Sequence, residues 1–427
     1  MLEPPLHALG QPGGIEEKII TKGMGFLMDF ALSEDHLMVQ EIARKFGETE
    51  VAPKIQELDE AGTWDDEFIR RMGELGLLGI SFPEKYGGLG LDYISLAVAC
   101  EELERIDTSL RVVLSVHIGL CGLGILQWGN SDQKDRYLPG LASGRLIGGY
   151  GLTEPNAGTD VAALEATAER DGDHYILNGE KIWISLSDVA DVFLAFAYTD
   201  RSKGHSGISA FIVERGFPGF ASSPIHGKMG VRAGNTGGFT MTDCRVPAEN
   251  LLGNEGEGFK IAMSCLDNGR FTVAAGAVGL IQASLDASVK YANERETFGT
   301  SIGHHQLVQR MIAHMVQRVE AGRLLVHRAG WLKNKGERNT RETALAKWYA
   351  TQASFDSAAD AIQIHGAYGF SNEYPVERYL RNSKGAVIYE GTREIMEVLQ
   401  GQYALGQRKD KPVRRKLPAW PFNEDEV

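Results

Sequence analysis

The segment HYILNGEKIWIS, residues 174–185, decides the fold, because it has a β-pattern in the middle of a chain whose two flanks have helical patterns. Apolar and polar residues alternate on both sides of Asn178-Gly179, and an Asn-Gly pair in that setting predicts a β-hairpin. Strand-like runs follow in VADVFLAFAYT, GISAFIVER and GFTMTDCRV. Short strands separated by turn residues predict a small antiparallel β-barrel or sandwich over residues 149–258.

Helical patterns flank this β-region. From residue 31 to 148, apolar residues recur every three or four positions, starting with SEDHLMVQEIARKFGETEV, whose Ser33 can cap a helix. The same periodicity returns over residues 259–406, in runs long enough for a four-helix bundle. The fold class expected is therefore α+β multidomain, with an N-terminal all-helical domain, a middle β-domain and a C-terminal helical bundle.

The two ends of the chain lie outside the three expected domains. Residues 1–30 form an N-terminal extension with no readable export or transit signal. Residues 407–427 form a tail that is basic and then acidic and contains three prolines. This composition predicts an extended arm instead of a packed element.

Composition excludes several classes of function. The net charge of −13 argues against nucleic-acid binding, which needs a clustered basic surface. The four cysteines form no CxxC pair, so neither a zinc site nor a disulfide framework is expected, and a cytoplasmic location fits best. The uncharged stretch 112–131 contains His117, Gln127 and Asn130, which favours a buried helix over a membrane span.

Three segments carry candidate chemistry, each with a simpler alternative. GLTEPNAGTD, residues 151–160, can present backbone N–H groups to a ligand, or form an ordinary Asn/Gly/Asp turn. RETFG, residues 295–299, can offer a cation to a pyrophosphate, or end a helix with a solvated arginine. IYEGTREI, residues 388–395, places Glu390 between an aromatic residue and a glycine. If buried, that carboxylate has a raised pKa and can act as a base.

Taken together, these segments resemble the acyl-CoA dehydrogenase family over about residues 30–406. YGLTEPNAGTD is similar to its first signature, NGEKIWIS to its flavin-facing strand, and NGRFTVAAGAVGLIQASLDASVKYANERETFG to its third-domain helices. QIHGAYGFSNEYPVERYLRNSK, followed by IYEGT, is similar to its second signature and catalytic loop. Several motifs in fixed order rarely coincide. The resemblance, to the short-chain and glutaryl-CoA dehydrogenase-like branch, implies FAD, an acyl-CoA substrate, a homotetramer and an electron-transferring flavoprotein as acceptor.

The resemblance also assigns roles to residues. Glu390 matches the base that removes the α-proton of the thioester. FAD is expected to contact Tyr150, Leu152, Thr153, Trp183, Ser185, Arg295, Phe298, Gln306, Gln363, Gly366, Thr392 and Glu394, some of them from a neighbouring subunit. The substrate is expected to contact Thr159, Arg270, Gly391, Arg111, Glu104 and Tyr389. One departure is WISLS, in which Ser185 stands where the family usually has threonine and keeps a hydroxyl near the flavin.

The acyl group depends on the segment EELERIDTSLRVVLSVH. Glu104 and Arg111 are two helical turns apart and are expected on one helix face. In glutaryl-CoA dehydrogenases a similar pair lies near the distal carboxylate, with the arginine as counterion, and Tyr389 agrees with the decarboxylating type, whereas Arg393 does not. Alternatively, Arg111 pairs with Glu104 or Asp107 and never meets the substrate. Dicarboxylic and plain short-chain or alicyclic thioesters both stay open.

Two other functions are less consistent with the sequence. An acyl-CoA oxidase is disfavoured by the length of 427 residues and the single helical bundle. A non-catalytic flavoprotein scaffold is disfavoured because a structural relic has no need for the Glu390 carboxylate.

Overall fold

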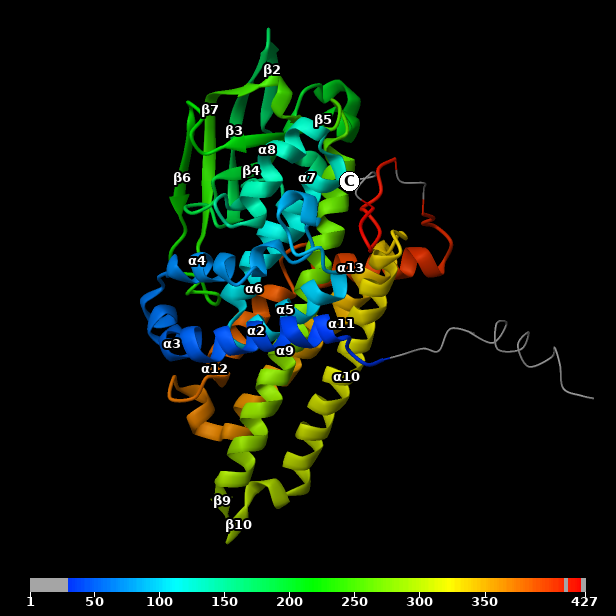
Figure 1. The fold of residues 1–427 in the computed structure, drawn as a ribbon. Helices are drawn as coiled ribbons and strands as arrows, with labels where there is room; N and C mark the ends of the chain where they lie inside the picture. The colour runs from blue at the N-terminus through cyan, green and yellow to red at the C-terminus, as the bar shows by residue number, and fades with distance from the viewer. Residues whose placement is uncertain (1–29, 411–413, 424–427) are drawn as a thin grey trace, which may run out of the picture.

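The computed structural model describes residues 30–410 and 414–423 (Figure 1). Its N-terminal helices are α2 (Glu34–Phe46), α3 (Ala52–Ala61), α4 (Glu67–Glu74), α5 (Tyr93–Ile106), α6 (Thr108–Leu114), the π-helical segment η4 (Ser115–Gly122), α7 (Leu123–Trp128) and α8 (Ser131–Ala142). The Ser33 cap is confirmed, because its hydroxyl accepts a hydrogen bond from the His36 N–H at the start of α2. The expected N-terminal extension lies outside the described residues, apart from Phe30.

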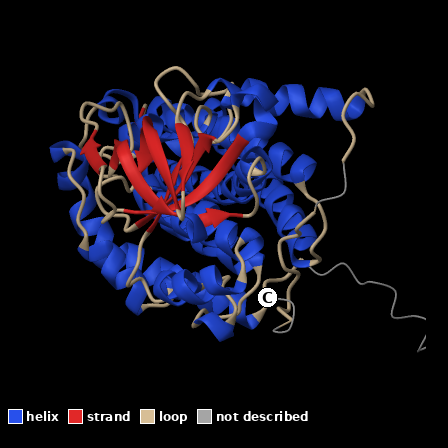
Figure 2. Ribbon diagram, turned by 90° about the horizontal axis from the view of Figure 1, so that it is seen from above, coloured by secondary structure: helices blue, strands red, loops and turns tan. Residues whose placement is uncertain are grey.

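The middle of the chain forms one eight-stranded sheet. Its strands are β1 (Gly148–Gly151), β2 (Thr167–Asp171), β3 (His174–Ser185), β4 (Val192–Tyr198), β5 (Ile208–Glu214), β6 (Phe220–Pro224), β7 (Thr236–Pro247) and β8 (Leu251–Leu252), in the order β6-β7-β3-β2-β4-β5-β8, with β1 paired to β4. Most pairings are antiparallel, as expected, but β1–β4 and β2–β4 are parallel. Figure 2 shows this sheet from above, with helices around it.

The predicted hairpin at Asn178-Gly179 is wrong. Strand β3 continues through both residues and pairs with β2 on one side and β7 on the other. Gly179 lies at a shift of the β3–β7 register, where its φ of 150° and lack of a side chain accommodate a bulge against Ala166. The chain turns instead at Gly172 and Asp173, where Gly172 has a φ of 61° that favours glycine.

The C-terminal helices return to the N-terminal ones. They are α9 (Gly258–Glu294), α10 (Gln306–Asn334), α11 (Thr340–His365), α12 (Val376–Ala386) and α13 (Arg393–Ala404), with the short strands β9 (Glu296–Thr297) and β10 (Thr300–Ser301) between α9 and α10. Helix α9 packs against α5, α10 and α11, so that one apolar core runs through all three parts of the chain. Thr108–Trp128 and α9 are long and apolar enough to cross a membrane, but their apolar windows are 100% and 72% buried, as in core helices.

The C-terminal tail was expected to be an extended arm instead of a packed element, and the expectation that it does not pack is wrong. Its described residues have no regular secondary structure, but they pack on the body of the protein. The Tyr93 hydroxyl donates to the Pro418 carbonyl at 2.8 Å, and the Trp420 N–H donates to the Asn334 carbonyl at 2.7 Å. Leu417 and Phe422 add apolar contacts with the core, which the charge pattern of the tail did not predict.

Candidate active site

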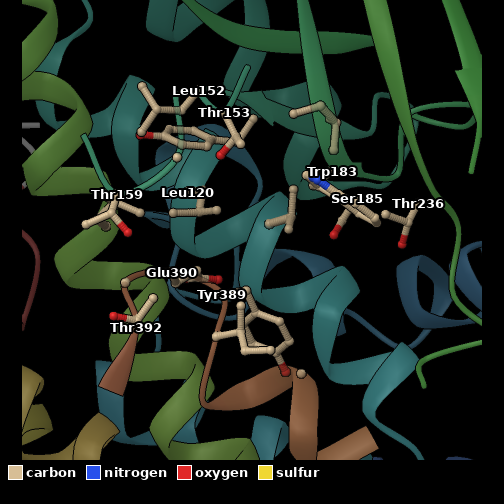
Figure 3. A pocket seen from close by; sticks show the side chains of 18 of the residues that line it. Leu120, Leu152, Thr153, Thr159, Trp183, Ser185, Thr236, Tyr389, Glu390 and Thr392 are labelled. Atoms are coloured by element: carbon tan, nitrogen blue, oxygen red, sulfur yellow. The ribbon is translucent and has the colours of Figure 1, made fainter. Parts of the chain in front are cut away.

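A cavity of about 1040 Å³ lies between the β-sheet and the helices. It is lined by twelve residues predicted from the sequence, namely Arg111, Tyr150, Leu152, Thr153, Thr159, Trp183, Ser185, Arg270, Tyr389, Glu390, Gly391 and Thr392. Figure 3 shows Trp183 and Ser185 on the sheet side, and Glu390 and Tyr389 on the loop that faces them. The cavity is at the upper end of the range for ligand sites, so it has room for a large ligand or for two.

The sheet side of the cavity is shaped by a β-bulge. Strand β3 shifts register between Ile182 and Ile184, and Trp183 at the bulge has a φ of 61°. A bulge re-aims a side chain, and here the Trp183 side chain is 60% exposed into the cavity instead of packing in the sheet. Thr153 and Ser185 add hydroxyl groups beside it. This wall combines a flat aromatic surface with hydrogen-bonding groups and fits a planar, polar-edged cofactor.

The opposite side is a loop with an unusual backbone. Glu390 has a φ of 54° and Gly391 a φ of 99°, between α12 and α13. The Glu390 carbonyl accepts a hydrogen bond from Arg270 Nε at 2.9 Å, and the Gly391 carbonyl accepts one from Lys347 Nζ at 2.8 Å. The Thr392 hydroxyl caps α13. Two buried cations on α9 and α11 therefore hold a strained loop, as is common at functional sites.

The Glu390 carboxylate is only partly paired. Its Oε1 accepts a hydrogen bond from Ser115 Oγ at 3.2 Å, and its Oε2 has no hydrogen-bond partner. Burial raises the pKa of Glu390, and the positive charges of Arg111 and Lys347 oppose that rise. Gly269 on α9 leaves room for the carboxylate, because a Cβ there would lie 2.0 Å from Oε2. This arrangement suits a general base with one oxygen free to take a proton.

The backbone between Glu104 and Arg111 is not the single helix that their spacing predicted. Asp107, with extended backbone, ends α5 and caps α6, so Glu104 and Arg111 do not share one helix face and the expectation of a single helix is wrong. They still meet, with Arg111 Nε donating to Glu104 Oε2 at 2.6 Å, because the chain bends between them.

The environment of Arg111 connects the ion pair to the cavity. Its Nη2 donates to the Tyr389 hydroxyl at 2.6 Å, and its guanidinium carbon lies 5.5 Å from the centre of the Tyr389 ring. Burial opposes the charge of Arg111, but Glu104 and Tyr389 outweigh burial and raise its pKa. Gly276 on α9 makes room, since a Cβ there would lie 1.9 Å from Glu104 Oε2. Arg111 thus both pairs with Glu104 and lines the cavity, while Asp107 pairs with Arg378 instead.

Several predicted residues do not line this cavity in a single chain. They are Glu104, which lies behind Arg111, Glu394, which pairs with Arg393 at the surface, and the group Arg295, Phe298, Gln306, Gln363 and Gly366. Figure 1 shows β9 and β10, which flank Phe298, at the end of the molecule far from the sheet. The Phe298 side chain is 99% exposed there.

Several residues that build the site are not among those predicted from the sequence. Ser115 and Thr272 form a buried hydroxyl pair at 2.6 Å beside Glu390, and Lys347 holds the loop. Gly269 and Gly276 lie two turns apart on α9 and face the two carboxylates. The one available signal was a lysine among small apolar residues in TALAKWYA, because a charge on an apolar helix face needs a partner.

Family models match almost the whole described chain. The N-terminal domain model of acyl-CoA dehydrogenase matches residues 33–145, the middle domain model residues 149–244, and the C-terminal domain model residues 256–402.

Individual relatives agree with these models. The chain is 43% identical to the short-chain-specific acyl-CoA dehydrogenase of Clostridium acetobutylicum, over 87% of this chain and 98% of that one. It is 42% identical to the glutaryl-CoA dehydrogenase of Desulfococcus multivorans, over 90% and 99%. A solved structure described as the electron transferring flavoprotein of Acidaminococcus fermentans contains a chain with a TM-score of 0.87 and 47% identity, covering 88% of this chain and all of that one.

Proposed function

The chain belongs to the acyl-CoA dehydrogenase family, whose members are FAD-dependent oxidoreductases, and we propose that it dehydrogenates a short acyl-CoA thioester with Glu390 as the base. The observation that carries this proposal is the free Oε2 of a buried carboxylate, on a strained loop that faces the Trp183 wall. When bound, FAD supplies the acceptor for the β-hydride. Trp183, Ser185 and Thr153 are the residues that would hold its ring system against the sheet.

The chain itself supplies the acid–base part of the reaction. The α-proton of a thioester is too weakly acidic for a carboxylate in water, so the developing negative charge on the thioester oxygen needs a donor. Among the described residues none accepts a hydrogen bond from the Glu390 N–H, which supports its use as that donor. Burial of Glu390 raises its pKa and strengthens it as a base, while Ser115 orients the carboxylate.

For the acyl group, we favour a short dicarboxylic thioester of the glutaryl type. Arg111 lines the cavity, and its bond to Tyr389 ties the guanidinium to the residue before the base. A guanidinium in this position can bind the distal carboxylate of a dicarboxylic acyl group. The second candidate is an uncharged short-chain or alicyclic thioester, and the 2.6 Å bond between Arg111 and Glu104 supports it, because the charge of Arg111 is already balanced.

The base is tested with Glu390→Gln. This change keeps the size of the side chain but removes proton acceptance, so the variant is expected to retain yellow FAD and thioester binding and to lose most turnover. Anaerobic bleaching of the flavin by substrate measures the reaction directly. Substantial bleaching by the variant would mean that the base is elsewhere.

The acyl group is tested by bleaching with glutaryl-CoA, butyryl-CoA and cyclohexanoyl-CoA, with analysis of products for carbon loss. The double variant Arg111→Met/Glu104→Leu removes both buried charges, which avoids leaving one unpaired. If Arg111 reads a carboxylate, the Michaelis constant for glutaryl-CoA rises far more than that for butyryl-CoA. An equal effect on both thioesters would favour the second candidate.

We also propose a homotetramer and an electron-transferring flavoprotein as the acceptor. Arg295, Phe298 and Gln306 lie far from the cavity of their own chain, which supports their use in the FAD site of a neighbouring subunit. The similarity to a chain in a structure of an electron transferring flavoprotein supports the acceptor. The four cysteines are buried and free, in keeping with the proposed cytoplasmic location. Light scattering tests the tetramer, and reduction of the purified flavoprotein partner tests the acceptor.

A further inference from the structure

Lys347 is a fully buried lysine whose position has no structural explanation in helix packing alone. It lies on α11 among Ala344, Ala346 and Ala350, all of them buried, and its side chain extends to the α12–α13 loop. Its Nζ donates to the Gly391 carbonyl at 2.8 Å. A neutral carbonyl does not balance an ammonium charge, and a buried charge without a counter-charge is costly.

The counter-charge is on the same loop. Glu390 and Glu394 are the carboxylates that favour the charged form of Lys347, and Glu390 is the stronger of the two. Glu394 is exposed and is paired with Arg393 at 2.8 Å, so it is already balanced at the surface. Glu390 directly precedes Gly391, whose carbonyl binds the ammonium, and among the described residues no group forms a hydrogen bond with its buried Oε2, so Glu390 is the carboxylate left to balance Lys347.

We propose that Lys347 is a positioning residue for the base: it fixes the loop through the Gly391 carbonyl, and its ammonium charge stabilises the ionised form of the Glu390 carboxylate before the thioester binds. This inference rests on the proposed function. The two roles are separate, because the hydrogen bond acts on the backbone and the charge acts on the side chain.

Other charged groups surround the base, and the effect of the Lys347 charge on Glu390 has to be distinguished from theirs. The titratable groups that face Glu390 or its charge partners are Arg111 on α6, Glu104 and Cys100 on α5, Arg270 and Asp267 on α9, Lys347 on α11, Tyr150 on β1, and Tyr389 and Glu394 on the chain segment of Glu390 itself. Arg111 and Arg270 each already have an acidic partner, Glu104 and Asp267 respectively. Lys347 is the cation in this group whose charge responds to pH, since burial lowers its pKa to about 7 against the opposing effect of Glu390.

The positive charge of Lys347 determines the direction in which its removal changes the pKa of Glu390. A nearby cation lowers the pKa of a carboxyl group by roughly one unit or more. Removing the charge of Lys347 therefore raises the pKa of Glu390, and the base becomes protonated at a higher pH. The acidic limb of the pH–rate profile moves toward neutral pH, and at a pH below both limbs the rate falls about tenfold for a shift of one unit.

The test is the pH profile of anaerobic flavin bleaching for three variants. Lys347→Met removes both the charge and the hydrogen bond. Lys347→Gln keeps an N–H donor for Gly391 without the charge, and Lys347→Arg keeps the charge. The proposal expects the acidic limb to move up in the Met and Gln variants and to stay in place in the Arg variant. If Lys347→Met fails to fold, Lys347→Gln still decides, and an acidic limb at the wild-type pH in that variant overturns the proposal.

A control and a second readout separate this role from a structural one. Lys333 on α10 is also buried, but it donates to Asn268 and lies over the Phe271 ring, so Lys333→Met is expected to leave the acidic limb unmoved. The protonated carboxyl band in infrared difference spectra of wild type against Glu390→Gln, followed with pH, reports the base without turnover. It is expected to persist to higher pH in Lys347→Gln. If Glu390→Gln stays active, the proposed function fails; if it is inactive but the band and limb do not move, only the role of Lys347 fails.

Discussion

The space that α9 leaves for the base gives a sharp prediction. A Cβ at Gly269 would lie 2.8 Å from Glu390 Cδ and 2.0 Å from Glu390 Oε2. The distance to Oε2 is about 1.4 Å shorter than ordinary contact at 3.4 Å. The Gly269→Ala variant therefore has to displace the carboxylate by more than an ångström. Since a misplacement of about 1 Å can cost about 100-fold in rate, we expect kcat to fall by about 100-fold.

The fold should survive this change. Overpacking of a core site costs about 1–3 kcal/mol, whereas alanine in a helix is favoured over glycine by about 1 kcal/mol. The assay is stopped-flow bleaching of the flavin, with FAD absorbance and melting temperature measured on the same samples. Gly401→Ala is the matched control, because Gly401 also lies in a helix and a Cβ there meets nothing within 4 Å.

A double variant tests the cause of the loss. Glu390→Asp shortens the base by one methylene and should lose activity in the wild-type background. In the Gly269→Ala background the shorter side chain relieves the overlap, so the two losses should be less than additive. Turnover of Gly269→Ala within threefold of the wild type, or fully additive losses in the cycle, would refute the assigned position of the base.

Two further predictions concern stability. Gly276→Ala places a Cβ 1.9 Å from Glu104 Oε2 and forces apart the buried Glu104–Arg111 pair, so urea unfolding should show a loss of about 3 kcal/mol, and an unchanged midpoint would contradict this reading. Burial raises the pKa of Glu390 in the folded state, so the folded protein binds its proton more tightly than the unfolded chain, and stability falls as pH rises through that range. Glu390→Gln should accordingly melt at a higher temperature than the wild type at pH 8, with a difference that shrinks toward pH 4; a constant difference in differential scanning fluorimetry would rule out this contribution.

The sequence motifs predicted the site residues more accurately than they predicted the helices and strands that carry those residues. Twelve predicted residues line one cavity, although the strand that holds Trp183 was expected to turn at Asn178-Gly179. An Asn-Gly pair reports a backbone that tolerates positive φ, and a bulge satisfies that as well as a hairpin does. The local signal could not distinguish them, because the difference depends on β7, which pairs with β3 from about sixty residues further along the chain.

The missed residues share a physical reason. Gly269, Gly276 and Lys347 act on groups that are distant in the sequence, and their roles depend on how α9 and α11 pack against α5 and the catalytic loop. The Glu104–Arg111 pair was predicted for the wrong reason, since helix periodicity placed it on one face and the break at Asp107 creates the contact instead. Periodicity describes one element, whereas these contacts belong to tertiary structure.

The packing of the tail has a consequence for folding during synthesis. The Tyr93 hydroxyl donates to the Pro418 carbonyl, and the Trp420 side-chain N–H donates to the Gly90 carbonyl. Both hydrogen bonds join residues more than three hundred positions apart. The surface around Gly90 and Tyr93 therefore stays uncovered during synthesis until residues 418–420 have left the ribosome. A nascent chain stalled before Arg414 would expose that surface to chaperones, and synthesis beyond residue 420 would allow the tail to cover it.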